Sequence, residues 1–257
     1  MKNPKIILIT GASSGLGAEL AKSYAAPGIK LHLFGRNQQR LDEISFQCTD
    51  LGAIVKKHTS DVCNEKKMRD ILNKIFLKDE VDLVIANAGI SGGTSGGSEG
   101  EEQIRKIFAT NLGGLLNTIL PAIPYFEERG KGQIAITSSL AGFRGMPSCP
   151  AYSASKGAVK LLGEGLRGML SKKNIEVTVI TPGYIETPMT KANNFPMPFL
   201  IKVEKAAQII KSKLKNNPAR ISFPWPLHLV VWFLSCLSPT LTDPLFARLP
   251  SKTPIGE

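Results

Sequence analysis

Short apolar segments alternate with longer segments of mixed polarity along most of the chain. The apolar segments have the length of buried strands, and the stretches between them are long enough for a helix and two turns. This alternation predicts parallel strands joined by right-handed helical crossovers, in a single α/β domain with helices on both faces of a doubly wound sheet. The predicted strands are residues 5–10, 30–34, 53–58, 82–87, 132–138, 175–181 and 219–223.

Polar residues and glycines gather where these predicted strands end. In doubly wound sheets ligands bind at the carboxyl ends of the strands, so one crevice is expected to hold all of these positions. The residues at the strand ends are Gly11, Gly35, Asp61, Asn87, Ser139 and Pro182.

The first strand runs directly into a glycine-rich turn and then a helix. Leu16, Leu20 and Tyr24 recur at helical spacing, so the glycines lie where the backbone can approach a ligand closely. Free amides at a helix start suit a pyrophosphate. An ordinary tight turn is the alternative, but strand, glycines and helix in this order favour a phosphate site. The expected contacts are Gly11, Ser13, Ser14, Gly15, Leu16 and Gly17.

A tyrosine and a lysine four residues apart are the clearest candidates for chemistry. Tyr152 and Lys156 lie in a segment, 151 to about 171, that is predicted to be helical, so both side chains project from one face. The lysine charge is expected to lower the tyrosine pKa from its usual ~10. Ser139, from the preceding strand end, is expected to hydrogen-bond the same substrate oxygen. Because Tyr-x-x-x-Lys also occurs by chance, its significance depends on the other motifs.

Composition indicates a folded domain of the cytoplasm. Hydrophobic residues make up 42% of the 257 residues, which argues against disorder. The net charge of +11 comes from short, scattered lysine groups without a nucleic-acid motif, so it indicates a solvated surface that also attracts an anionic cofactor. The cysteines are scattered and lie apart from the histidines, so we expect no metal site and expect the thiols to be free. The residues concerned are Cys48, Cys63, Cys149, Cys236, His32, His58 and His228.

Together these motifs resemble the short-chain dehydrogenases/reductases over roughly residues 4–190. The matching positions are Thr10-Gly-x-x-x-Gly-x-Gly17, Asp61-Val62, Asn87-Ala-Gly89, Asn111, Ser139, Tyr152 with Lys156, and Pro182-Gly183 with Thr187. The resemblance implies a Rossmann-like fold and a catalytic tetrad of Asn111, Ser139, Tyr152 and Lys156. It also implies that Asp61 meets the adenine, Asn87 steadies the sheet and Thr187 contacts the nicotinamide. The further implied cofactor contacts are Val62, Asn87, Ala88, Gly89, Tyr152, Lys156, Pro182 and Gly183.

The end of the second predicted strand indicates which dinucleotide binds. Gly35 stands where NAD-specific sites place a carboxylate for the ribose 2′-hydroxyl. Arg36 follows with a permanently charged, planar fork that suits a 2′-phosphate. Asn37, Arg40 and Ser14 are expected to assist. Arg36 could instead be an exposed loop residue, but the combination predicts NADP(H) as the cofactor.

Site and resemblance together imply an oxidoreductase. Hydride would pass between the nicotinamide and a carbonyl carbon while Tyr152 exchanges a proton with the oxygen. Lys156 would hold the ribose, Asn111 would position a water, and Ser139, rather than the competing Ser138, would stabilise charge on the oxygen. The alternative is a dinucleotide-binding regulator or sensor without turnover. Such a protein would be expected to lack a tetrad residue, and all four are present.

The substrate is expected to be an apolar ketone or secondary alcohol. Apolar and aromatic residues should form the pocket walls: Phe143, Met146, Tyr184, Met189 and the segment 194–200. The glycine-rich stretch 89–100 is expected to be mobile beside them. We divide the single domain, 1–257, into a cofactor-binding and catalytic core (1–190), a substrate lid with the last strand (190–222) and a C-terminal extension (223–257).

The extension contains an apolar segment, 227–237, that is too short to span a bilayer, which needs ~20 residues. Three interpretations stay open: packing on the core or lid, a contact between subunits, or peripheral membrane attachment through Trp225 and Trp232. The resemblance implies a homodimer or homotetramer, and the localisation is expected to be cytoplasmic or peripheral to a membrane.

Overall fold

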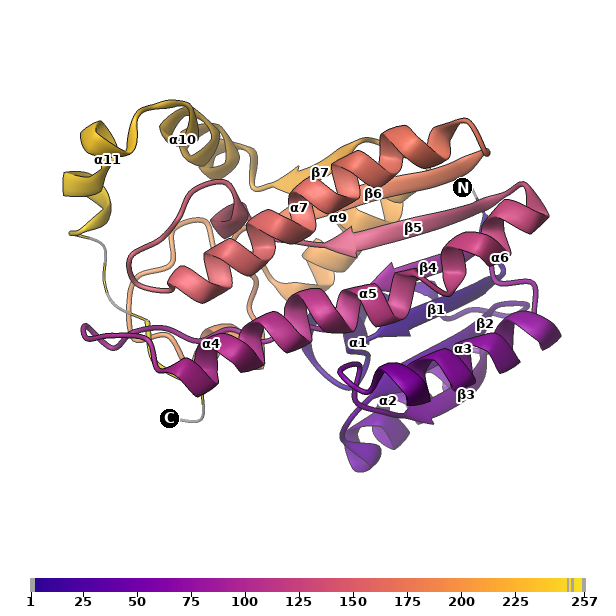
Figure 1. Ribbon diagram of the computed structural model, residues 1–257. Coiled ribbons are helices and arrows are strands. Elements are labelled where there is room, and N and C mark those ends of the chain that lie inside the picture. The colour runs from indigo at the N-terminus through magenta and orange to yellow at the C-terminus, as the bar shows by residue number, and fades with distance from the viewer. Residues whose placement is uncertain (1–2, 249, 251, 256–257) are drawn as a thin grey trace.

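The computed structural model describes residues 3–248, 250 and 252–255, and a wholly parallel sheet of seven strands forms its centre (Figure 1). The strand order is β3-β2-β1-β4-β5-β6-β7. The strands are β1 (Ile6–Thr10), β2 (Lys30–Gly35), β3 (Ile54–Thr59), β4 (Leu83–Ala86), β5 (Gly132–Thr137), β6 (Ile175–Pro182) and β7 (Arg220–Phe223). Each predicted strand end lies within one residue of the observed one. The predicted doubly wound α/β domain is confirmed.

Helices cover both faces of the sheet because the central strands are apolar on both sides. In β1, Ile7 and Ile9 pack in one core cluster and Leu8 packs in the other, as the two-residue period of a strand requires. On the first face lie α1 (Gly15–Tyr24), α2 (Gln38–Asp50) and α9 (Val203–Leu214). On the second lie α3 (Glu65–Lys78), α5 (Gly114–Ile119), α6 (Ala122–Arg129) and α7 (Pro150–Ser171).

A nearly continuous helical stretch, 101–129, crosses the second face. It runs through α4 (Glu101–Phe108), a π-helical turn η1 (Ala109–Gly113), α5 and α6. By length and composition alone it could cross a membrane, but 44% of its most apolar window is buried within the fold. Ile119 and Phe126 are fully buried against the sheet. The stretch therefore packs as a core helix.

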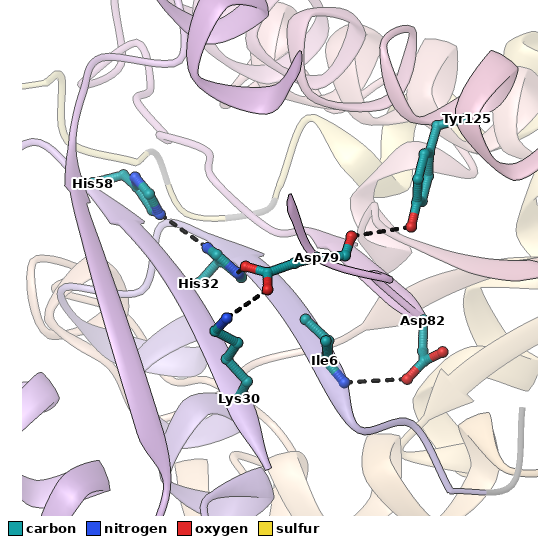
Figure 2. A network of polar contacts seen from close by, with 7 residues as sticks. All are labelled: Ile6, Lys30, His32, His58, Asp79, Asp82 and Tyr125. Atoms are coloured by element: carbon teal, nitrogen blue, oxygen red, sulfur yellow. Dashed lines mark hydrogen bonds and ion pairs between the residues drawn. The ribbon is translucent and has the colours of Figure 1, made fainter. Parts of the chain in front are cut away.

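A polar network interrupts the apolar packing beside β2 and β3 (Figure 2). One ring nitrogen of His32 lies 3.0 Å from the Asp79 carboxylate, and the other lies 3.0 Å from His58. The Asp79 carboxylate also accepts a hydrogen bond from Lys30. Burial lowers the pKa of both histidines, that of His58 to about 4. These histidines are thus part of the sheet packing and lie apart from the site described below.

The chain ends in two helices beyond the carboxyl ends of the strands. These are α10 (Trp225–Cys236) and α11 (Pro239–Phe246), drawn in yellow in Figure 1. Arg144 holds α11 through its guanidinium, which donates to the carboxylate of Asp243 at 2.6 Å and lies over the ring of Phe246. Residues 252–255 then return toward the loop before α4. The predicted apolar C-terminal extension is therefore helical and ends at the same edge of the sheet as the site.

Candidate active site

A cavity of about 600 Å³ opens at the carboxyl ends of the strands. Its walls come from the turn after β1, the ends of β2, β4, β5 and β6, the start of α7, and the C-terminal extension. Almost all of the predicted site residues line it. The three that do not are Gly17, Asp61 and Asn111.

The turn between β1 and α1 forms one wall and has the features of an anion site. Gly11 and Gly15 have φ angles of +68° and +54°, which side chains other than glycine rarely adopt. Ser14 precedes the helix without using its hydroxyl to cap it, and the first turn of α1 contains no acidic residue. The positive end of the helix dipole thus faces the cavity without a neutralising carboxylate. A pyrophosphate fits this wall.

Gly17 and Asn87 support that turn from behind. A Cβ at Gly17 would lie 2.2 Å from the main-chain oxygen of Gly11, so glycine there lets α1 pack closely on the turn. The main-chain N–H of Asn87 donates to the Thr10 hydroxyl at 3.1 Å, and its side-chain amide donates to the Thr10 carbonyl at 3.2 Å. These bonds join β4 to β1 beside the cavity, which is the position expected for a residue that steadies the sheet.

Arginines line the end of the cavity beside β2. Arg36 and Arg40 both face it, while Asn37 caps α2 by accepting the N–H of Arg40 at 2.9 Å. At Gly35 a Cβ would lie 2.8 Å from that of Ser13, so there is no room for a side chain. Asp61 lies off the cavity wall, because its carboxylate accepts the N–H of Cys63 and faces Arg36 at 3.8 Å. The expected contact between Asp61 and the adenine stays a prediction.

Tyr152, Ser139 and Lys156 meet at the centre of the cavity. The first turns of α7 carry Tyr152 and Lys156, as predicted, and the Lys156 ammonium lies 5.9 Å from the centre of the Tyr152 ring. That ammonium donates to the carbonyl of Thr137 at 2.9 Å, at the end of β5. Ser139 follows, and its hydroxyl donates to the Pro182 carbonyl at 3.4 Å and accepts the N–H of Ala141 at 3.1 Å. It is close enough to Tyr152 to lower the pKa of the phenol. The three side chains can serve one reacting oxygen.

The pKa values of this group differ from the expectation. Burial raises the pKa of Tyr152 to about 12, and the hydrogen bond from Ser139 offsets this only in part. Burial also lowers the pKa of Lys156, to about 8. The expectation that Lys156 lowers the Tyr152 pKa was therefore wrong for this structure, because the loss of hydration outweighs the charge. The phenol is protonated at neutral pH.

Asn111 supports the site without lining the cavity. Its side chain is 1% exposed and lies in the π-helical turn η1, a feature that often marks functional positions. The amide donates to the Ile90 carbonyl and to the hydroxyl of Ser155, and its oxygen accepts the N–H of Ile90 at 2.8 Å. Asn111 therefore ties the loop after β4 to α7. The structure gives its side chain this positioning contact rather than a place on the cavity wall.

Apolar residues form the opposite end of the cavity. Met146, Tyr184, Met189 and Phe195 line it, as the sequence suggested, but Phe143 does not. The Phe143 ring packs instead against His228 of α10 and beneath the cations Lys160 and Arg220. Sequence reasoning missed further lining residues from the C-terminal extension: Leu227, Val230, Val231, Leu234, Leu245, Phe246, Pro250 and Lys252. Their apolar pattern indicated a buried face but not which surface it covers.

The glycine-rich loop before α4 is tied at several points, although its composition suggested mobility. The N–H of Thr94 donates to the Ser148 carbonyl at 3.1 Å, and that of Ser95 donates to the Lys252 carbonyl at 2.9 Å. Gln103 donates to the Gly93 carbonyl at 3.0 Å. The loop therefore connects α4, the segment before α7 and the chain's last described residues.

Helix α10 has two apolar faces. Leu227, Val231 and Leu234 line the cavity, in agreement with the interpretation that the extension packs on the core and lid. Trp225 and Phe233 lie on the other side and are 71% and 58% exposed. Packing on the core therefore leaves a second apolar surface uncovered.

The comparisons with known proteins agree with this geometry. A family model described as short chain dehydrogenase matches residues 5–197. An uncharacterized oxidoreductase of Myxococcus xanthus (strain DK1622) is 36% identical over 246 residues, which cover 94% of this chain and 96% of that protein. The likeness in sequence therefore continues beyond residue 197.

Two solved structures share the fold. A short-chain dehydrogenase from Sphingobium yanoikuyae, in complex with NADPH, has a TM-score of 0.79 at 24% identity, and the match covers 95% of this chain and 96% of that one. A short chain dehydrogenase from Mycobacterium paratuberculosis, bound to NAD, has a TM-score of 0.76 at 22% identity, with coverages of 86% and 97%. One of these proteins holds NADPH and the other NAD, so the likeness does not distinguish between the two dinucleotides.

Proposed function

Since this chain belongs to the short chain dehydrogenase family, whose members are NAD- or NADP-dependent oxidoreductases, we propose that it is an NADP(H)-dependent enzyme that interconverts a carbonyl and a secondary alcohol. One observation carries the proposal. Tyr152, Ser139 and Lys156 line one cavity. The glycine turn and the start of α1, which has no side-chain cap and no acidic residue in its first turn, form another wall of that cavity. A dinucleotide site and an acid/base group thus face one another.

Three features support NADP(H) as the cofactor. Gly35 provides no carboxylate for a ribose 2′-hydroxyl, and Arg36 and Arg40 line the cavity where a 2′-phosphate would lie. Among the described residues, Arg36 has only a distant ionic partner in Asp61, and both side chains are about half exposed, so the pair costs little to separate. We expect the 2′-phosphate to replace that partner. Ser14 adds a free hydroxyl on the same wall.

The chain's own residues account for the proton transfer. When bound, the nicotinamide supplies or accepts the hydride. Tyr152 donates its phenolic proton to the carbonyl oxygen during reduction, and its raised pKa keeps that proton in place over the neutral range. Ser139 hydrogen-bonds the same oxygen as charge develops on it. Lys156 holds a positive charge beneath the phenol and stabilises the phenolate that reduction leaves behind.

The apolar end of the cavity supports an apolar substrate. Met146, Tyr184, Phe195 and Leu227 line the same cavity as Tyr152. We therefore propose a ketone or secondary alcohol with an apolar body as the substrate, bound in the core (1–190) beneath the lid (190–222). A clear preference for small sugars in a substrate screen would contradict this.

The exposed face of α10 supports self-association. Trp225, Leu229, Trp232 and Phe233 recur at helical spacing and are all about half exposed or more. An apolar face of this kind on a cytoplasmic protein suits a second copy of the chain. We propose a homodimer or larger oligomer formed through α10, and contact with a membrane is the competing outcome.

A coupled assay tests the proposed activity. NADPH absorbance is followed against a panel of aldehydes, ketones and quinones, with Tyr152→Phe as the control and NADPH binding measured by fluorescence for both proteins. We expect turnover by the wild type, and a loss of at least roughly a hundredfold in kcat for the variant with binding retained. Binding without turnover by the wild type on every compound would indicate a regulator instead.

A further inference from the structure

The last described residues of the chain form part of the substrate pocket. The carbonyl of Lys252 accepts the N–H of Ser95 at 2.9 Å, the N–H of Ile255 donates to Gln103 at 2.8 Å, and the hydroxyl of Thr253 donates to the Ala192 carbonyl at 3.1 Å. These bonds attach the segment 252–255, here called the tail, both to the glycine-rich loop and to the lid.

Two glycines of that loop make room for the tail. A Cβ at Gly93 would lie 2.3 Å from the Lys252 carbonyl oxygen and 2.4 Å from its Cβ. A Cβ at Gly92 would lie 2.8 Å from Ile255. Any side chain at Gly93 would displace main-chain atoms, which cannot move aside as a flexible side chain can. Glycine at these two positions therefore allows the tail to pack directly against the main chain of the loop.

The tail directs one charged side chain into the pocket. The Lys252 ammonium lies 5.0 Å from the centre of the Tyr152 ring and donates to the hydroxyl of Ser91 at 2.5 Å. Burial lowers the pKa of Lys252, and the nearby thiol of Cys149 offsets this in part. Lys252 is thus a largely buried cation that faces a hydroxyl and a thiol, and no carboxylate is among the described residues that line the cavity around it.

The charged side chains around the cavity all have the same sign. Within the described part of the chain, the charged residues that line it are all cations: Arg36, Arg40, Lys156 and Lys252. The two arginines lie at the β2 end, and Lys156 is bonded to the Thr137 carbonyl. Lys252 is therefore the cation that faces the apolar end. Burying an unbalanced ammonium is costly, and an anion that enters with the substrate offsets this cost.

We propose that Lys252 binds an anionic group, a carboxylate in the simplest case, on the substrate of this enzyme. This inference rests on the proposed function, because it places the substrate between Lys252 and Tyr152. Since Lys252 lies over the ring whose hydroxyl meets the reacting oxygen, the anionic group is only a few bonds from the carbonyl carbon. The substrate class is thus a keto acid or hydroxy acid with an apolar body. The ammonium would form a charge-assisted hydrogen bond to it.

A matched pair of compounds tests the proposal. An apolar keto acid and its methyl ester, which differ only in the negative charge, are compared in wild type, Lys252→Met and Lys252→Arg. We expect the wild type to prefer the acid in kcat/KM, and Lys252→Met to lower the acid-to-ester ratio by roughly ten- to a hundredfold, mainly through KM. Lys252→Arg, which keeps the charge, should retain most of the preference. Gly93→Ala, which displaces the tail, should lower the ratio as Lys252→Met does.

Other results would overturn it. Equal kcat/KM for acid and ester in the wild type would contradict the proposal. An equal loss of kcat/KM for both compounds in Lys252→Met would also contradict it, and would mean that Lys252 only holds the tail in place. Thermal melting and NADPH binding of each variant separate these outcomes from misfolding. Binding of the acid to the enzyme–NADP⁺ complex is measured by calorimetry as well. If no compound is turned over, the proposed activity is wrong. The role of Lys252 is then decided by calorimetry, because weaker binding of the acid to Lys252→Met than to the wild type would still support it.

Discussion

The hydroxyl of Ser138 donates a hydrogen bond of 2.7 Å to the main-chain carbonyl of Lys156, and so joins the end of β5 to the second turn of α7. Both Ser138 and its neighbour Ser139 are buried and line the cavity, but it is Ser139 that lowers the pKa of Tyr152. Two adjacent serines therefore have different tasks, one in the framework of the site and one in its chemistry.

The two alanine variants should separate these tasks. Ser138→Ala removes a buried hydrogen bond and should lower the free energy of unfolding by about 1–3 kcal/mol, measured by urea titration. Ser139→Ala should lower kcat by roughly a hundred- to a thousandfold, with a smaller change in stability. A larger loss of kcat in Ser138→Ala than in Ser139→Ala would reverse the assignment.

Carbonyl reduction should decline in alkali as Lys156 loses its charge. The Lys156 pKa, lowered to about 8 by burial, predicts that the ammonium deprotonates as the pH rises through 8, while Tyr152 with a pKa of about 12 keeps its proton. The measurement is kcat/KM against pH at saturating NADPH. Lys156→Arg stays charged and should move the decline to higher pH, although at a lower rate. An unchanged decline in that variant would assign it to another group.

Replacing Arg36 should weaken NADPH binding selectively. Arg36→Ala is expected to raise the KM for NADPH by roughly tenfold or more and to change that for NADH little, because only NADPH carries the 2′-phosphate. The converse change must make room first, since a Cβ at position 35 would lie 2.8 Å from that of Ser13. Gly35→Asp combined with Ser13→Gly should therefore favour NADH. Equal changes for both dinucleotides in either variant would contradict the assignment.

The histidine network should make the fold sensitive to acid. His58 has its pKa lowered to about 4 by burial, below the ordinary ~6.5 of an unfolded chain. The unfolded state therefore takes up a proton first, and stability present above about pH 6.5 is lost as the pH falls toward 4. His58→Gln cannot titrate and should show a shallower loss of melting temperature between pH 7 and 4. Parallel curves for wild type and variant would exclude His58 as the cause.

Charging the outer face of α10 should dissociate the oligomer. Light scattering is expected to give a dimer or larger species for the wild type and a monomer for Trp232→Glu combined with Phe233→Glu. Leu77→Glu is the matched control, because Leu77 of α3 is 86% exposed on a different surface. A wild type that is monomeric without detergent and floats with lipid vesicles would point to membrane contact instead.

Local sequence patterns predicted the strands and the central site well. The central strands are short runs rich in apolar residues that stop near a turn residue, so their ends depend on neighbours in sequence, whereas the edge strand β3 contains Lys56 and Lys57. Ser139, Tyr152 and Lys156 follow from two such elements. What sequence could not predict depends on long-range packing. Ser91 and Lys252 are 161 positions apart and meet only because the tail crosses the loop, and no periodicity marks that contact.

The sequence also could not predict how far each side chain is buried in the folded protein. The expected effect of Lys156 on Tyr152 considered charge alone, whereas the folded protein removes water from both groups, which raises the pKa of Tyr152 and lowers that of Lys156. The sequence likewise placed Phe143 in the pocket wall, and this was wrong because its ring packs against His228, which comes from a helix 85 positions later.

The tail across the pocket has a practical consequence for anyone who purifies this protein. The first strand starts at the amino edge of the sheet, and the chain's last described residues lie at the opposite edge (Figure 1). An affinity tag on the C-terminal side would follow the tail, which lines the cavity, whereas a tag on the N-terminal side would precede β1, whose start lies at the opposite edge of the sheet. Recombinant material should therefore carry its tag at the amino terminus, and assays on protein tagged at the other end should be repeated after cleavage.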